Sequence, residues 1–225
     1  MPAVMPVVGR RSWLPADITN MRLNNNIVRA SIVASAPSVN SRIRIEWWDG
    51  SAWTNYLDVG VGVVGYPSAD SFNMNTCQVL RNSVEECSLR YTGTITGVTG
   101  LCTIDLAVRR GSPLLFVDVS STTTTAVWQA YTGLASTSYP LDAGGVGYMV
   151  ANVARAPSTI IFPFVTGATA TTGSTSDGRV TCTSATASAQ FAFGSPFKNS
   201  SSSLPEYEVR AFYRALSESV RVVDF

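Results

Sequence analysis

Apolar and polar side chains alternate with a period of two along much of the first half of the chain. The clearest run is Cys102–Arg109, in which every second residue is Cys, Ile, Leu or Val. This period is typical of a β-strand with one buried side and one solvent-facing side. The turn-forming segment Arg110–Pro113 leads into a second alternating run, Leu114–Val119, so the two runs predict an antiparallel hairpin.

Another hairpin is predicted around Asp49–Gly50, a pair that favours a two-residue type I′ turn. Such a turn gives three inward pairs: Trp47 with Ala52, Ile45 with Thr54, and Ile43 with Tyr56. The opposite face then carries Arg44, Glu46 and Trp53. We expect this face to be mostly polar and solvent-facing, as in an antiparallel sheet with one buried face.

Further strands are predicted where short β-prone runs lie between turn signals. They cover Ile27–Ala34, Cys77–Leu80, Cys87–Thr92, Tyr148–Val153, Ser158–Val165, Arg179–Thr183 and Gln190–Phe193. Leu57–Tyr66 fits a bulged strand or a loop, and Pro163 places its strand at a sheet edge or near a strand end. Thr166–Ala189 consists almost entirely of Gly, Ala, Ser and Thr, so much of it is expected to form a long loop. About nine short strands without intervening helices predict an all-β chain folded as an antiparallel, jelly-roll-like β-sandwich.

Three regions follow from the turn and composition signals. Residues 1–26 contain prolines and apolar residues and predict an extended arm, which either folds back on its own domain or docks on a neighbouring subunit. Residues 27–198 form the sandwich. In 199–225, a Ser-rich linker precedes a short C-terminal helix, with an edge strand over Val209–Leu216 as the alternative.

The composition narrows the class of protein. The chain is 45% hydrophobic and 14% charged, which excludes a charged disordered protein. Its 16 basic and 15 acidic residues give a net charge of +1, so no broad field favours nucleic acid. No apolar run is long enough for a membrane span. We therefore expect neither nucleic acid nor membrane as a partner.

The residue types for common catalytic and metal chemistry are scarce. His is absent, and Lys198 is the only lysine, beside a Ser-rich linker. Asp105 and Asp118 fall on polar strand faces, where solvated carboxylates are expected. The cysteines have no metal-site spacing: Cys77, Cys87, Cys102 and Cys182. Cys87 and Cys102 fall within alternating apolar patterns, so we expect them to be buried free thiols in a reduced protein, with one disulfide as the alternative. We expect no enzyme activity and no catalytic, cofactor or metal site.

Three tryptophans gather at the first hairpin. Exposed indoles on a β-sandwich could stack on sugar rings, which makes Trp48 and Trp53 candidate glycan-binding residues. The alternation places Trp47 in the core, and packing in the core or at a subunit interface is the favoured role of the cluster.

Several segments resemble tail proteins of tailed bacteriophages, in particular distal or minor tail components. The similarity spans roughly positions 40 to 120. It rests on Trp-Trp-Asp-Gly-Ser-Ala-Trp at 47–53, Val-Leu-Arg-Asn-Ser-Val-Glu-Glu at 79–86 with Leu-Arg-Tyr at 89–91, and Val-Arg-Arg-Gly-Ser at 108–112.

The resemblance implies a non-enzymatic virion protein, assembled in several copies in the cytoplasm of the bacterial host. Its partners would then be further copies and other virion proteins. We expect the terminal regions to supply intersubunit anchors, with Trp13, Phe212, Tyr213 and Phe225 as candidates. The alternatives are a head, neck or capsid decoration protein, and a carbohydrate-binding module that recognises a host-surface glycan.

Overall fold

The structure is a computed structural model, and it describes a defined part of the chain. The described residues are 22–35, 40–48, 51–65, 72–123, 125–131, 136–140, 147–151, 159–164, 171–174, 179–182 and 185–194. The predicted N-terminal arm up to residue 21, the predicted linker and the predicted C-terminal helix, with its alternative edge strand over 209–216, lie outside them. The anchor candidates there are Trp13, Phe212, Tyr213 and Phe225.

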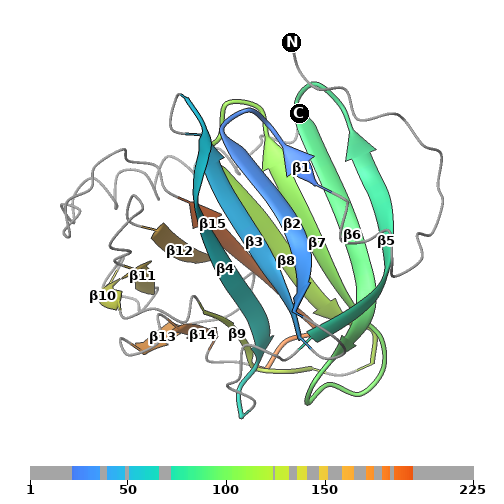
Figure 1. Ribbon diagram of the computed structural model, residues 1–225. Helices are drawn as coiled ribbons and strands as arrows, with labels where there is room; N and C mark the ends of the chain where they lie inside the picture. Colours follow the sequence, from blue (N-terminus) through green and yellow to red (C-terminus); the bar gives the residue numbers. More distant parts are fainter. Residues whose placement is uncertain are drawn as a thin grey trace, which may run out of the picture.

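Antiparallel strands build two sheets (Figure 1). The first sheet has the order β1 (Leu23–Asn24), β2 (Val28–Ser35), β3 (Asn40–Trp48), β4 (Trp53–Val63), β9 (Trp128–Tyr131), β14 (Arg179–Cys182), β13 (Thr171–Ser174). The second has the order β10 (Ser136–Pro140), β11 (Gly147–Ala151), β12 (Thr159–Phe164), β15 (Ser188–Gly194), β8 (Leu114–Ser121), β7 (Cys102–Arg109), β6 (Glu86–Ile95), β5 (Phe72–Asn82).

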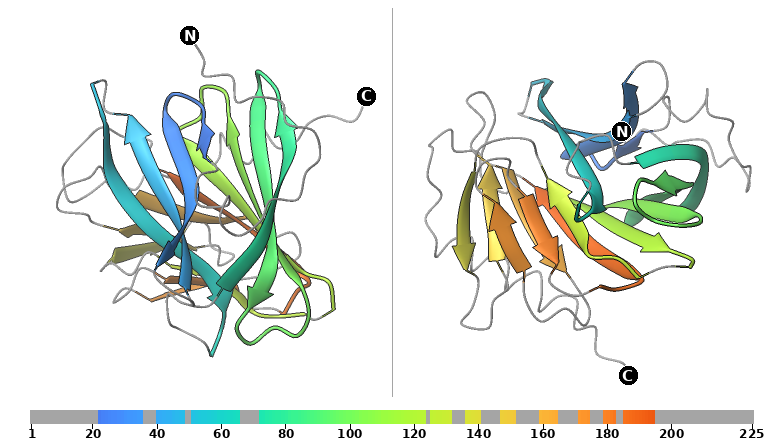
Figure 2. Two further views of the ribbon diagram at one scale, coloured as in Figure 1. Left: turned by 45° about the vertical axis from the view of Figure 1, so that its right-hand side comes forward. Right: turned by 90° about the horizontal axis from the view of Figure 1, so that it is seen from below.

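The sheets pack face to face as a β-sandwich, and the right-hand view of Figure 2 shows the two layers. β1 lies against β6 and β7, and β2 lies against β8. Inward side chains of both sheets form one apolar core, including Ile43 and Ile45 of the first sheet and Leu106, Val117 and Phe191 of the second. The predicted all-β sandwich is therefore confirmed, and the described residues contain no helix.

The hairpin β7–β8 matches its sequence pattern. Ile104 pairs with Val119 and Leu106 with Val117, and all four side chains are fully buried. Gly111 in the turn has φ +71°, a conformation that glycine adopts without steric cost.

The predicted register of the β3–β4 hairpin is wrong. Trp48 pairs with Trp53 and Trp47 with Thr54, so four residues, 49–52, connect the strands instead of two. A bulge in β4 opposite Glu46 then shifts the ladder again, and Ile45 pairs with Leu57. Trp47 is nonetheless in the core, because the longer turn moves its partner by two residues and preserves its face.

For Leu57–Tyr66 the sequence predicts either a bulged strand or a loop. Most of its described residues, which end at Gly65, belong to β4, whose ladder with β3 contains a bulge, so the bulged strand is confirmed. Pro163 lies one residue before the end of β12. The ladder between β11 and β12 stops at Ile161, so the missing N–H of Pro163 interrupts no bond to β11.

Several short strands have too little sequence pattern to be predicted. β9 and β10 are not predicted by the sequence pattern, and neither is β13, which lies in the expected loop 166–189. The strand predicted at Arg179–Thr183 in the same region is confirmed as β14. The sandwich also begins before residue 27, because β1 pairs with β2 and Leu23 is only 1% exposed.

All four cysteines are free, and Cys102 is buried as predicted, as are Cys77 and Cys182. The predicted burial of Cys87 is wrong: it is half-buried, because it lies at the start of β6 next to the β5–β6 turn. Burial raises the pKa of Cys77 and that of Cys182, each to about 11. These thiols therefore remain protonated at neutral pH and act as small core side chains.

Candidate functional site

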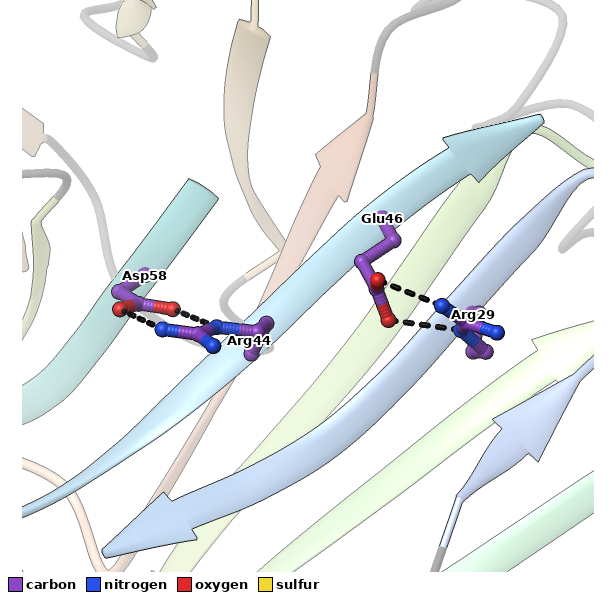
Figure 3. Close-up of polar contacts among 4 residues, drawn as sticks. All are labelled: Arg29, Arg44, Glu46 and Asp58. Atoms are coloured by element: carbon purple, nitrogen blue, oxygen red, sulfur yellow. Dashed lines mark hydrogen bonds and ion pairs between the residues drawn. The ribbon is translucent and has the colours of Figure 1, made fainter. Parts of the chain in front are cut away.

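Two arginine–carboxylate pairs lie on the outer face of β2, β3 and β4 (Figure 3). Arg29 donates from Nε to Oε2 of Glu46 at 2.7 Å and from Nη2 to Oε1 at 2.6 Å. Arg44 donates from Nε and Nη2 to the two carboxylate oxygens of Asp58, both at 2.8 Å. Each pair is bidentate, the geometry that orients both side chains most firmly.

Strand register explains both pairs. Arg29 lies directly opposite Glu46 across β2 and β3, and Arg44 lies opposite Asp58 across β3 and β4. Alternation turns all four side chains away from the core. Those of Arg29 and Glu46 are only 21% and 19% exposed, so their hydrogen bonds are partly shielded from water.

The two candidate tryptophans meet beside the first of these pairs. Trp48 and Trp53 are directly opposite at the turn end of the hairpin, with ring centroids 5.5 Å apart and planes inclined by 58°. The guanidinium carbon of Arg29 lies 4.7 Å from the centroid of the Trp53 ring, within cation–π range. We call Trp48, Trp53, Arg29 and Glu46 the indole platform.

The backbone beneath the indole platform is anchored to the rest of the fold. The Trp48 N–H donates to the carbonyl of Ile27 at 2.9 Å. The indole N–H of buried Trp47 donates to the carbonyl of Pro113 at 3.4 Å, which ties β3 to the β7–β8 turn. Trp48 itself is 40% exposed, so the platform combines a fixed base with an accessible ring.

A polar row crosses the outer face of the second sheet. Register aligns Gln78, Arg90, Asp105, Asp118 and Gln190, one from each of five neighbouring strands. Arg90 donates to both carboxylate oxygens of Asp105, at 2.8 and 2.6 Å. Asp105 is therefore held as an ion-pair partner.

Asp118 is the carboxyl group of this row with a raised pKa. The pKa of Asp118 is raised from 3.8 to about 6, first by loss of hydration and then by the negative charge of Asp105, against the opposing effects of Arg109 and the hydrogen bond to Gln190. Glu86 adds a smaller repulsion. Among the described carboxyl groups, Asp118 therefore stands out by a pKa that is raised toward neutral pH.

Two further carboxylates, Glu85 and Glu86, lie in ion pairs near the β5–β6 turn. Glu86 is 3.2 Å from Arg109 and 3.6 Å from Arg81, while Glu85 is 3.4 Å from Arg110. No group of three or more potential metal ligands occurs among the described residues. The same part of the chain has no helix with the length and apolar character of a membrane span.

The sequence named Trp48 and Trp53, and the structure brings them together. The sequence pattern places Glu46 on the same face as Trp53 but does not identify Arg29 as a neighbour of the two tryptophans. The signal was present, since a hairpin pairing of the predicted strands 27–34 and 42–48 would have aligned Arg29 with Glu46. The connecting residues 36–39 give no turn motif strong enough to fix that register.

The segments that resemble phage tail proteins converge in space. Residues 47–53 span the β3–β4 turn, 79–86 lead through the β5–β6 turn, and 108–112 enter the β7–β8 turn. These turns lie at the upper end of the sandwich in Figure 1, with the β1–β2 turn beside them. We call this surface the four-turn end.

Direct contacts hold the four-turn end together. The side-chain amide of Asn25 donates to the carbonyls of Arg109 and Ser112, at 2.6 and 2.8 Å. The Arg110 N–H donates to the carbonyl of Glu85 at 2.9 Å. Val84, in the β5–β6 turn, is 77% exposed.

Comparison with protein-family models, curated proteins and solved structures finds no significant match to this chain.

Proposed function

We propose that this chain is a non-enzymatic structural protein of a tailed-phage virion, a distal or minor tail component assembled in several copies. The observation that carries the proposal is the convergence of all three tail-like segments on the four-turn end. Segments separated by some sixty positions in the sequence share one surface, as residues that serve one contact would.

The exposed apolar side chain of Val84 supports a contact role for this end. A single exposed valine is ordinary on a monomer. At the four-turn end it lies among hairpin turns that are hydrogen-bonded to one another, which gives a partner a rigid surface. Assembly takes place in the host cytoplasm, and the partners are further copies and other virion proteins.

Particle composition tests the proposal. Particles from an infected culture that produces this chain are purified by density gradient, analysed by quantitative mass spectrometry and labelled with gold-conjugated antibody. We expect a fixed copy number per particle and label on the tail. Label on the head or neck would favour a decoration or neck protein instead, and absence of the chain from purified particles would refute a virion role.

A further inference from the structure

The indole platform has the features of a built binding site. Arg29 is fixed twice, by two hydrogen bonds to Glu46 and by its position over the Trp53 ring. Trp53 in turn contacts Trp48. The groups are therefore held in place before any ligand arrives, which reduces the conformational entropy that binding would cost.

A bulge adjoins the platform. The ladder between β3 and β4 shifts between Ile45 and Trp47, next to Glu46 and within a few residues of Trp53. Bulges redirect neighbouring side chains and are frequent beside functional sites. Here the shift coincides with the place where Arg29 of β2 reaches the Trp53 ring of β4.

The charges of the platform select against ionic ligands. An anion would have to compete with Glu46 for the guanidinium of Arg29, against a bidentate pair with distances of 2.6 and 2.7 Å. A cation would have to displace Arg29 from the face of Trp53. A neutral ligand avoids both costs.

The same groups suit hydroxyl-bearing rings. An exposed indole offers an apolar face to the C–H side of a sugar ring. A hydroxyl both donates and accepts, so one can bond the Glu46 carboxylate while another accepts from Arg29. We propose that the indole platform binds a neutral glycan, with a sugar ring stacked on Trp48 and hydroxyl groups at the Arg29–Glu46 edge.

Trp48 and Trp53 belong both to the indole platform and to the four-turn end, so glycan binding is measured separately from assembly. A panel of neutral tetrasaccharides tests the site. Maltotetraose, cellotetraose, mannotetraose and galactotetraose are titrated into the full-length chain, each up to about 10 mM, a range that still detects weak binding. Heparin tetrasaccharide serves as the anionic probe. Calorimetry and tryptophan fluorescence report binding. We expect saturable binding of at least one neutral member and none of the anionic probe.

Matched variants locate the site. Trp48→Ala should weaken binding at least about tenfold, because it removes the stacking surface. Arg29→Gln should weaken it several-fold, whereas Arg44→Gln should leave it within about twofold, since Arg44 belongs to the equivalent pair with Asp58. Trp48→Phe, which keeps an aromatic face, should restore most of the affinity that Trp48→Ala loses.

Any of four outcomes would show that the proposed glycan site is wrong. The first two are that no neutral tetrasaccharide binds and that only the anionic probe binds. The other two are that Trp48→Ala binds as tightly as wild type and that Arg29→Gln and Arg44→Gln lose affinity equally. Light scattering of the same samples measures assembly separately. If Trp48→Ala lowers the molar mass and leaves glycan binding unchanged, Trp48 is a protein contact and the glycan site is wrong.

Discussion

Gly93 illustrates how closely the second sheet is packed at the scale of single residues. It lies opposite Met74 in β5, where a bulge separates Met74 from Thr76 in the ladder. A Cβ added at Gly93 would meet the carbonyl oxygen of Asn73 and lie 2.7 Å from Cα of Met74. Both are backbone atoms, so a rotamer change cannot relieve the clash.

We expect Gly93→Ala to lower the free energy of unfolding by about 3 kcal/mol, the upper part of the usual range for overpacking. Urea unfolding followed by circular dichroism measures the change. The neighbouring exposed residue gives the control, and Thr94→Ala should stay within about 0.5 kcal/mol of wild type. An unchanged midpoint for Gly93→Ala would show that β5 and β6 are further apart than described.

Asp118 should make stability depend on pH. Its pKa is raised from 3.8 to about 6, so the folded state favours the protonated form. The stability contributed by this proton is fully present below about pH 4 and is lost as pH rises through about 6. Part of Asp118 is exposed, and solvent screening makes the effect smaller than full burial would give.

Asp118→Asn should therefore flatten the fall in unfolding free energy between pH 4 and 6 and should make the protein more stable than wild type at pH 7. Urea titrations at pH 4, 5, 6 and 7 measure this slope. Glu85→Gln is the control for removing a carboxylate, because the Glu85 side chain is 76% exposed in a turn. The same slope in Asp118→Asn and wild type would refute the raised pKa.

At the scale of elements, bidentate pairs connect the outer face of β2, β3 and β4. A double-mutant cycle on Arg29→Ala and Glu46→Ala should give a coupling of about 1 kcal/mol, the upper end for pairs near the surface. The more exposed pair of Glu85 and Arg110 should give less than about 0.3 kcal/mol. Equal coupling energies for the two pairs would indicate that the bidentate geometry of Arg29 and Glu46 does not contribute to stability.

Strands with regular alternation and the pairing of β7 with β8 could be predicted from the sequence, whereas the register of β3 with β4 could not. β2, β7 and β8 carry an apolar residue at every second position, which determines their faces. The β3–β4 register depended on turn length, and Asp49–Gly50 suggested two residues where the connection has four. β9, β10 and β13 are short and belong to segments without sustained alternation.

The candidate site was predictable only in part for the same reason. Trp48 and Trp53 stood out by residue type, whereas Arg29 joins them through pairing of β2 with β3. The row through Asp105 and Asp118 likewise exists only once β7 and β8 are aligned. Sequence identifies which face a side chain occupies, and register decides its neighbours.

At the scale of the whole molecule, the two ends of the sandwich should differ in function. We expect Val84→Asp, at the four-turn end, to weaken the proposed assembly, because it replaces an exposed apolar side chain of the proposed contact with a charge. Leu101→Asp is the matched control, since Leu101 is also an exposed apolar residue, 53% exposed, and precedes β7 at the opposite end. Sedimentation velocity compares them, and equal behaviour would argue against a contact at the four-turn end.

A scaffold that works through contacts between copies must associate, and molar mass measures this directly. Light scattering of the purified full-length chain, over a hundredfold range of concentration, gives that mass. We expect a defined multiple of the 24.0 kDa chain that persists on dilution. A mass of 24.0 kDa at every concentration would contradict the proposed assembly.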